Sequence, residues 1–114
     1  MRQESIKLIP TQAGANVSSS AVFAANLLYC SAQITATGTE VGSLKLQASN
    51  DNLDAVPSST PTNWSDIPSA TVAVSSAGAY LIPSTQICYQ YVRLVYTHTS
   101  GSGNITAVFK SIGA

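Results

Sequence analysis

The feature that most constrains this chain is the alternation of apolar and polar residues in short stretches. In "GSLKLQASND", Leu44, Leu46 and Ala48 alternate with polar neighbours, and "AQITAT" repeats the pattern around Ile34. A period of two is typical of a β-strand with one buried face and one wet face. We therefore expect Leu46→Ala to destabilise the fold and Gln47→Ala to be close to silent. The expected core residues are Ile34, Leu44, Leu46, Val92, Leu94 and Phe109, and the expected outward residues are Gln33, Thr35, Lys45 and Gln47.

Further short stretches suit strands, and clusters of Gly, Pro, Ser and Asn separate them. This spacing predicts an all-β chain folded as an antiparallel β-sandwich, jelly-roll-like in topology. The chain has no long stretch of helical period, although Ser20 is placed to cap a short helix over 21–28. The additional strands are expected at 6–9, 71–74, 79–82, 91–98 and 105–109.

The segment "SGSGN" predicts a reversal of the chain near the C-terminus. Gly101 and Gly103 reach positive φ without steric cost. We expect the strand over 91–98 to pair antiparallel with the strand over 105–109 as a hairpin.

Length and charge restrict the partners of the protein. The 114 residues suit one domain over 1–114, in which residues 1–20 form either a strand or an extended N-terminal arm. Basic and acidic residues number five each, and charged residues make up 9% of the chain against a typical quarter. The basic residues are scattered, which argues against a nucleic-acid partner. Such a neutral surface suits a protein that packs against other proteins.

The sequence also predicts neither export nor a membrane partner. Glu4 and Lys7 interrupt any secretory signal, and the apolar run "AVFAANLLYC" is much shorter than a membrane span. Two cysteines without a signal are more often reduced than bridged by a disulfide. We therefore expect Cys30 and Cys88 to be two buried thiols that act as small hydrophobes.

No set of residues has the spacing of a catalytic or metal site. His98 is the only histidine, it ends a predicted strand, and solvated histidines are common at such positions. Asp51, Asp54 and Asp66 lie in the predicted loop over 50–68, where turn formation explains them better than calcium binding or acid–base chemistry. Neither zinc-ligand spacing nor a G-x-S-x-G elbow is present. We predict no catalytic, cofactor-binding or metal-binding residues, and no enzyme.

Three segments together carry a family resemblance: "LKLQASND", "NWSDIPSATVAVSSAGAYLI" and "YQYVRLVYTHTSGSGNITAVF". Over 42–113 the chain resembles small structural proteins of tailed bacteriophages. The resemblance implies a virion protein of the capsid decoration or cement type, made in the bacterial cytoplasm and attached to the outer surface of the capsid. Its implied partners are the major capsid protein and further copies of itself, as a dimer or trimer. We expect Trp64 to fill an edge of the core above Tyr91 and Val92.

A second resemblance leaves an alternative open. Galactose-binding-like jelly rolls of the discoidin type also combine a Ser-Asn-Asp turn, a Trp and a Tyr-Val-Arg strand. That resemblance implies a glycan-recognition module of a phage tail or fibre, which would bind through the loop over 50–68. The chain is shorter than those domains and holds one Trp and two Phe, which is few for sugar stacking. The decoration hypothesis is therefore favoured.

Overall fold

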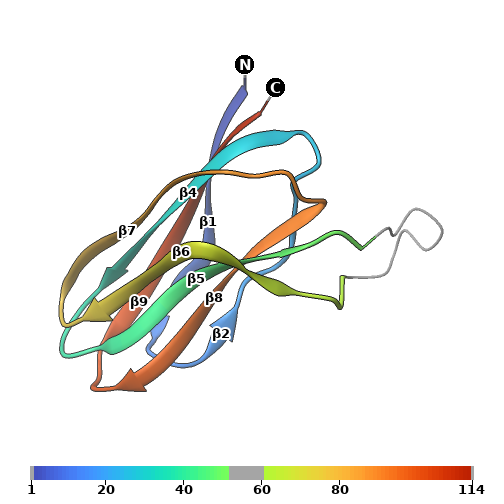
Figure 1. Cartoon of the computed structure of the whole chain (residues 1–114). Coiled ribbons are helices and arrows are strands. Elements are labelled where there is room, and N and C mark those ends of the chain that lie inside the picture. The colour runs from blue at the N-terminus through green and yellow to red at the C-terminus, as the bar shows by residue number, and fades with distance from the viewer. Residues whose placement is uncertain (1, 52–60, 114) are drawn as a thin grey trace.

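The structure, a computed structural model, describes residues 2–51 and 61–113, which form nine strands (Figure 1). No helix long and apolar enough to span a membrane occurs among these residues. The strands are β1 Arg2–Ala13, β2 Val17–Ser18, β3 Val22–Phe23, β4 Leu27–Ala36, β5 Val41–Ser49, β6 Ser65–Ser75, β7 Gly78–Gln86, β8 Tyr91–Ser100 and β9 Asn104–Gly113.

The strands form two antiparallel sheets that pack face to face. One sheet has the order β1-β9-β4-β7, and the other has the order β2-β8-β5-β6 with β3 also paired to β8. The pairs are nested along the chain: β1 with β9, β2 and β3 with β8, β4 with β7, and β5 with β6. A long antiparallel ribbon wound in this way is a jelly roll. The predicted β-sandwich and its jelly-roll topology are confirmed.

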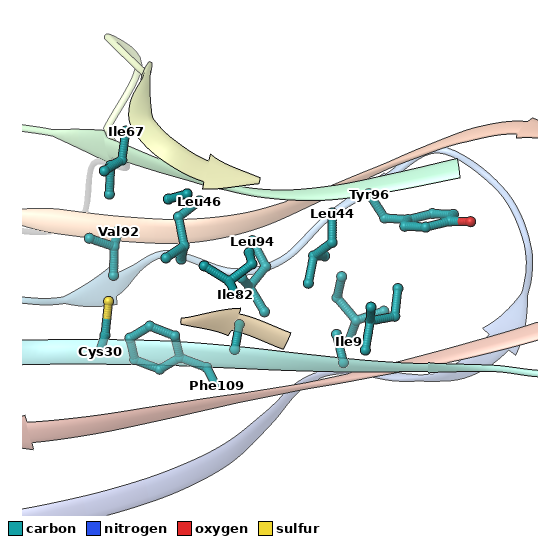
Figure 2. Packing of buried hydrophobic residues seen from close by; sticks show 14 of the residues in the cluster. Ile9, Cys30, Leu44, Leu46, Ile67, Ile82, Val92, Leu94, Tyr96 and Phe109 are labelled. Carbon is teal, nitrogen blue, oxygen red and sulfur yellow. The ribbon is translucent and has the colours of Figure 1, made fainter. Parts of the chain in front are cut away.

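The core lies between the sheets, as Figure 2 shows. All six residues expected inside are fully buried, and Tyr96, Ile9 and Ile82 fill the space around them. Burying one such side chain contributes about 1.5–3 kcal/mol, so this layer is the main source of stability. Gln33 and Thr35 are exposed as expected, whereas Lys45 and Gln47 point outward but are half-buried.

The predicted C-terminal hairpin is wrong in its pairing. The chain does reverse after Ser100, but β8 bonds to β5 in one sheet while β9 bonds to β4 in the other. The turn packs against a second cross-sheet turn, where the Thr39 N–H donates to the Ser102 carbonyl at 2.7 Å. Gly101 has φ +78°, and a Cβ there would overlap the carbonyl oxygen of Thr39. The glycines therefore serve the close packing of two turns.

Residues 21–28 do not form the short helix that Ser20 is placed to cap. The Ser19 N–H donates to the Leu94 carbonyl and the Ala24 N–H donates to the Gln90 carbonyl, both at 2.8 Å. The backbone between these residues therefore lies along β8 and forms β3 instead of a helix.

Two other predicted segments have different bounds in the structure. Residues 2–13 are the edge strand β1, paired with β9 inside the sandwich. The predicted loop over 50–68 ends earlier than expected, because β6 already begins at Ser65. Residues 52–60 of that loop lie outside the described residues.

The outer strands of both sheets are poorly suited to further strand pairing. Pro10 lies in β1, Pro68 in β6 and Pro83 in β7, and each of these strands is an edge. Proline has no N–H to offer an added strand. The remaining edge, along β8, is covered only by the two-residue strands β2 and β3. Partners are therefore better accommodated on the faces of the sheets than along their edges.

Candidate interaction surfaces

The outer face of the five-stranded sheet carries a connected row of polar side chains. The guanidinium of Arg93 donates through Nε and Nη2 to Gln47 Oε1, at 2.9 and 2.7 Å. Gln47 Nε2 then donates to Asp66 Oδ1 at 2.9 Å, and Lys45 Nζ lies 3.2 Å from the same oxygen. We call Lys45, Gln47, Asp66, Arg93 and Trp64 the polar ladder. Lys45, Gln47, Asp66 and Arg93 bond to one another across β5, β6 and β8, and Trp64 adjoins them through Arg93.

Trp64 belongs to this ladder and not to the core. The Arg93 guanidinium carbon lies 4.4 Å from the centroid of the indole ring, and the indole N–H donates to the Pro61 carbonyl at 3.1 Å. The expectation that Trp64 fills a core edge above Tyr91 and Val92 is therefore wrong. Its attraction to a cation on the outer face keeps it there.

The two described carboxylates of the loop region each accept hydrogen bonds from nearby groups. A hydrogen bond from Gln47, followed by one from Lys45, lowers the pKa of Asp66. Asp51 accepts from the Asn63 side chain and from the main-chain N–H groups of Thr62 and Asn63, which lower its pKa. Asp54 lies outside the described residues. Within 2–51 and 61–113, no group of three His, Cys, Asp or Glu side chains is arranged to hold a metal ion.

The outer face of the four-stranded sheet exposes large apolar side chains where the other sheet has the polar ladder. Cross-strand registers place Tyr29 beside Ile112, and Gln33 beside Val108 and Leu81. Leu81 is 62% exposed and Tyr29 is 44% exposed. We call this surface the apolar face, defined by the outward residues Tyr29, Ser31, Gln33, Leu81, Val108, Lys110 and Ile112.

Two neighbouring depressions shape the apolar face. One of about 300 Å³ is bordered by Leu81, Val108 and Gln33, and one of about 200 Å³ by Tyr29 and Ile112. Both share Ser31 and Lys110. The face therefore combines exposed apolar area with two hollows.

Several cross-sheet turns gather at one end of the sandwich (Figure 1). The side chains of Glu40, Tyr96 and His98 form a largely buried polar cluster next to the turn at Thr39. Glu40 is fully buried, and its Oε2 accepts from the Tyr96 hydroxyl at 2.5 Å and from His98 Nδ1 at 2.7 Å. Burial and the neighbouring carboxylate raise the pKa of Tyr96. The expectation of a solvated histidine at position 98 is wrong, because the ring is half-buried against Glu40.

Sequence reasoning did not single out Glu40. The available signal was an acidic residue in "TGTEVG", directly before a strand, in a chain with only five acidic residues.

The two cysteines occupy different surroundings. Cys30 is buried in the core, and desolvation raises its pKa to about 11. Cys88 is exposed, so the expectation of two buried thiols is wrong for this residue. Both thiols are free in the described part of the chain.

No family model and no curated protein matches this sequence. Among solved structures, this chain is similar to PirA, with 13% sequence identity and a TM-score of 0.59. The match covers 95% of this chain and 91% of the PirA chain. The SPBc2 prophage-derived protein YomS has 9% identity and a TM-score of 0.53, with 96% of this chain and 94% of its own covered. The PBSX exported protein XepA has 15% identity and a TM-score of 0.57; 99% of this chain is covered but only 35% of XepA. These similarities establish a shared fold.

Proposed function

We propose that this chain is a structural protein of a bacteriophage particle that attaches to the outside of the capsid and bridges neighbouring capsid subunits. The phage setting is supported by the sequence resemblance over 42–113 and by the prophage origin of YomS, which has the same fold. The attachment itself is argued from the surface of the sandwich.

The observation that carries the proposal is the apolar face. Leu81 and Tyr29 expose large apolar area beside two hollows, and Lys110 is its one charged member. Exposed apolar area of this kind is a feature of protein-binding surfaces. The prolines at the sheet edges disfavour strand addition, which leaves the faces for contact.

Such a protein would act without covalent chemistry. Each copy that binds only the assembled shell stabilises that shell by mass action, and contacts from one oligomer to several capsid subunits add avidity. A dimer or trimer around a capsid axis suits this role. Because the face is nearly neutral, we expect the affinity to depend only weakly on salt.

The test uses preformed capsids of the phage that carries this gene, mixed with purified protein and sedimented. Leu81→Glu should abolish binding because it places a charge at the most exposed large apolar side chain of the apolar face. Thr97→Glu, a change at an exposed position on the other sheet, should leave binding intact. If both variants bound like the parent, the apolar face would not be the docking surface. If capsids without the protein resisted heat as well as complete ones, the cement role would be wrong.

One observation favours the glycan-recognition alternative. A groove of about 280 Å³ lies beside the described base of the 50–64 region, and most of its polar lining is uncharged. Such a lining suits the hydroxyl groups of a saccharide. Binding of a host glycan that Asn63→Ala removes and Leu81→Glu leaves intact would support this function over capsid attachment. The lining residues are Ala48, Ser49, Asn50, Asn63, Ser65, Asp66, Ile67 and Tyr89.

A further inference from the structure

The chain crosses between the sheets directly above the carboxylate of Glu40. Gly14 follows β1 and lies so close that a Cβ there would overlap Glu40 Oε1. We call residues 14–18 the crossover, because they lead from β1 in one sheet to β2 in the other. The absence of a side chain at position 14 lets the backbone close over the buried acid.

The crossover is anchored to the same strand that holds the carboxylate. Asn16 Oδ1 accepts from the main-chain N–H of His98 at 2.8 Å, and Val17 is paired with Tyr96. Gly14 adds a bond from its N–H to the Gly103 carbonyl at 2.9 Å. Tyr96 and His98 therefore bind Glu40 through their side chains and the crossover through their main chains.

Protonation of either carboxylate oxygen of Glu40 would disturb the hydrogen bonding in this arrangement. Oε2 already faces two donors, from Tyr96 and His98, so a hydrogen on this oxygen would displace one of them. Oε1 is buried without a hydrogen-bond partner among the described residues, so a hydrogen there would be a buried donor without an acceptor. The two donors at Oε2 therefore favour the carboxylate over the carboxylic acid in the folded state.

We propose that Glu40 is an acid-sensitive latch that holds the crossover against the body of the sandwich. Protonation of its carboxylate weakens the bonds to Tyr96 and His98, and the segment anchored on those two residues then opens. The latch is a property of the fold and does not depend on the proposed attachment to a capsid.

The groups that face Glu40 come from three elements of the fold. From β8 come Tyr96 and His98, and His98 Nδ1 donates both in the neutral form with hydrogen on that atom and in the charged form. The β6–β7 turn contributes the Ser76 N–H, which bonds to the main-chain oxygen of Glu40, with the Tyr80 hydroxyl bonded to Ser76. The crossover contributes the uncharged Gly14 and Asn16.

The direction of the pH dependence follows from the folded state. Desolvation raises the pKa of Glu40, but the hydrogen bonds from Tyr96 and His98 and the charge of His98 outweigh it, so the pKa is lowered from its ordinary 4.5. The stabilisation is therefore complete above that ordinary value and is lost as the pH falls through the lower folded value. Between these two pKa values, the equilibrium constant for opening of the crossover should increase about tenfold for each pH unit by which the pH falls.

The experiment is an NMR titration of the intact chain from pH 7 to pH 3. The Glu40 carboxyl carbon and the amides of Gly14 and Asn16 should shift with one common midpoint below 4.5, while the Leu46 amide stays unchanged. Asp66→Asn should leave this transition in place, and Glu40→Gln should remove it.

Two results would overturn the proposal. One is a Glu40→Gln protein whose crossover amides still titrate as in the parent. The other is loss of the whole sandwich in the same step, seen as a simultaneous change at Leu46. The titration of the parent decides the question even if Glu40→Gln does not fold.

Discussion

The two outer faces of the sandwich differ in how far their side chains satisfy one another. On the five-stranded sheet, Arg93, Gln47 and Asp66 are bonded in a row, and Trp64 stacks on the guanidinium. On the four-stranded sheet, Leu81 and Tyr29 project into solvent beside open hollows. The ladder on the first face uses its polar groups internally, whereas Leu81 and Tyr29 on the second keep apolar area that no part of the described chain covers.

Surface residues on the two faces therefore contribute to different properties, either to the stability of the chain or to contact with another molecule. A ladder of mutually bonded groups contributes to the stability of the chain itself, because each member orders its neighbours. An exposed leucine contributes little until another molecule covers it. Stability measurements therefore distinguish the two faces before any partner is identified.

The largest expected difference in unfolding free energy is between alanine variants of two leucines, one in the core and one on the apolar face. Leu46→Ala removes a fully buried side chain and should lower the free energy of unfolding by about 2–5 kcal/mol. Leu81→Ala should change it by less than about 0.5 kcal/mol, because the side chain is mostly in water. Urea titrations of both variants provide the values. A large loss for Leu81→Ala would mean that the apolar face is already covered within the chain.

The next comparison uses two glutamines, one on each face. Gln47→Ala breaks the middle of the polar ladder and should cost about 1 kcal/mol, in contrast to the silent change expected from sequence alone. Gln33→Ala, on the apolar face, should stay within about 0.5 kcal/mol of the parent. Thermal unfolding of both variants measures the difference. Equal values would show that the ladder adds nothing to stability.

A smaller effect is expected within the ladder itself. A double-mutant cycle of Trp64→Ala and Arg93→Ala should give a coupling energy of about 0.5–1 kcal/mol, from the cation lying over the indole ring. Chemical denaturation of the four proteins of the cycle measures it. Additive losses would indicate that the stacking is geometrically present but energetically neutral.

The smallest expected effect is on the loss of thermal stability at low pH. The hydrogen bonds to Asp66 lower its pKa, so its contribution is complete above the ordinary carboxyl range and is lost as the pH falls through the folded value. Asp66→Asn should therefore narrow the difference in melting temperature between pH 7 and pH 3 slightly. The pKa values of Glu40 and Asp51 are lowered as well, so these residues also make the protein less stable in acid. The melting temperature of the parent must therefore be measured at both pH values for comparison. An unchanged difference would show that solvent screens this site completely.

The local pattern of the sequence predicted the strands and the sides that they bury. Leu44 and Leu46 face inward and Gln33 faces outward because a strand turns successive side chains to opposite faces, whatever its neighbours are. The jelly-roll class was also predictable, from the number and spacing of short strands. These properties depend on residues close together in the chain.

The partners of those strands and side chains were decided only by the tertiary structure. Gly101 and Gly103 indicate a reversal equally well within one sheet or between two, so the separation of β8 from β9 depends on packing against the turn at Thr39. Glu40 meets His98 across 58 positions of sequence, and no local pattern encodes such a meeting. Alternation is a property of each strand alone, whereas pairing, burial of an acid and exposure of Leu81 depend on which distant segments share the same space.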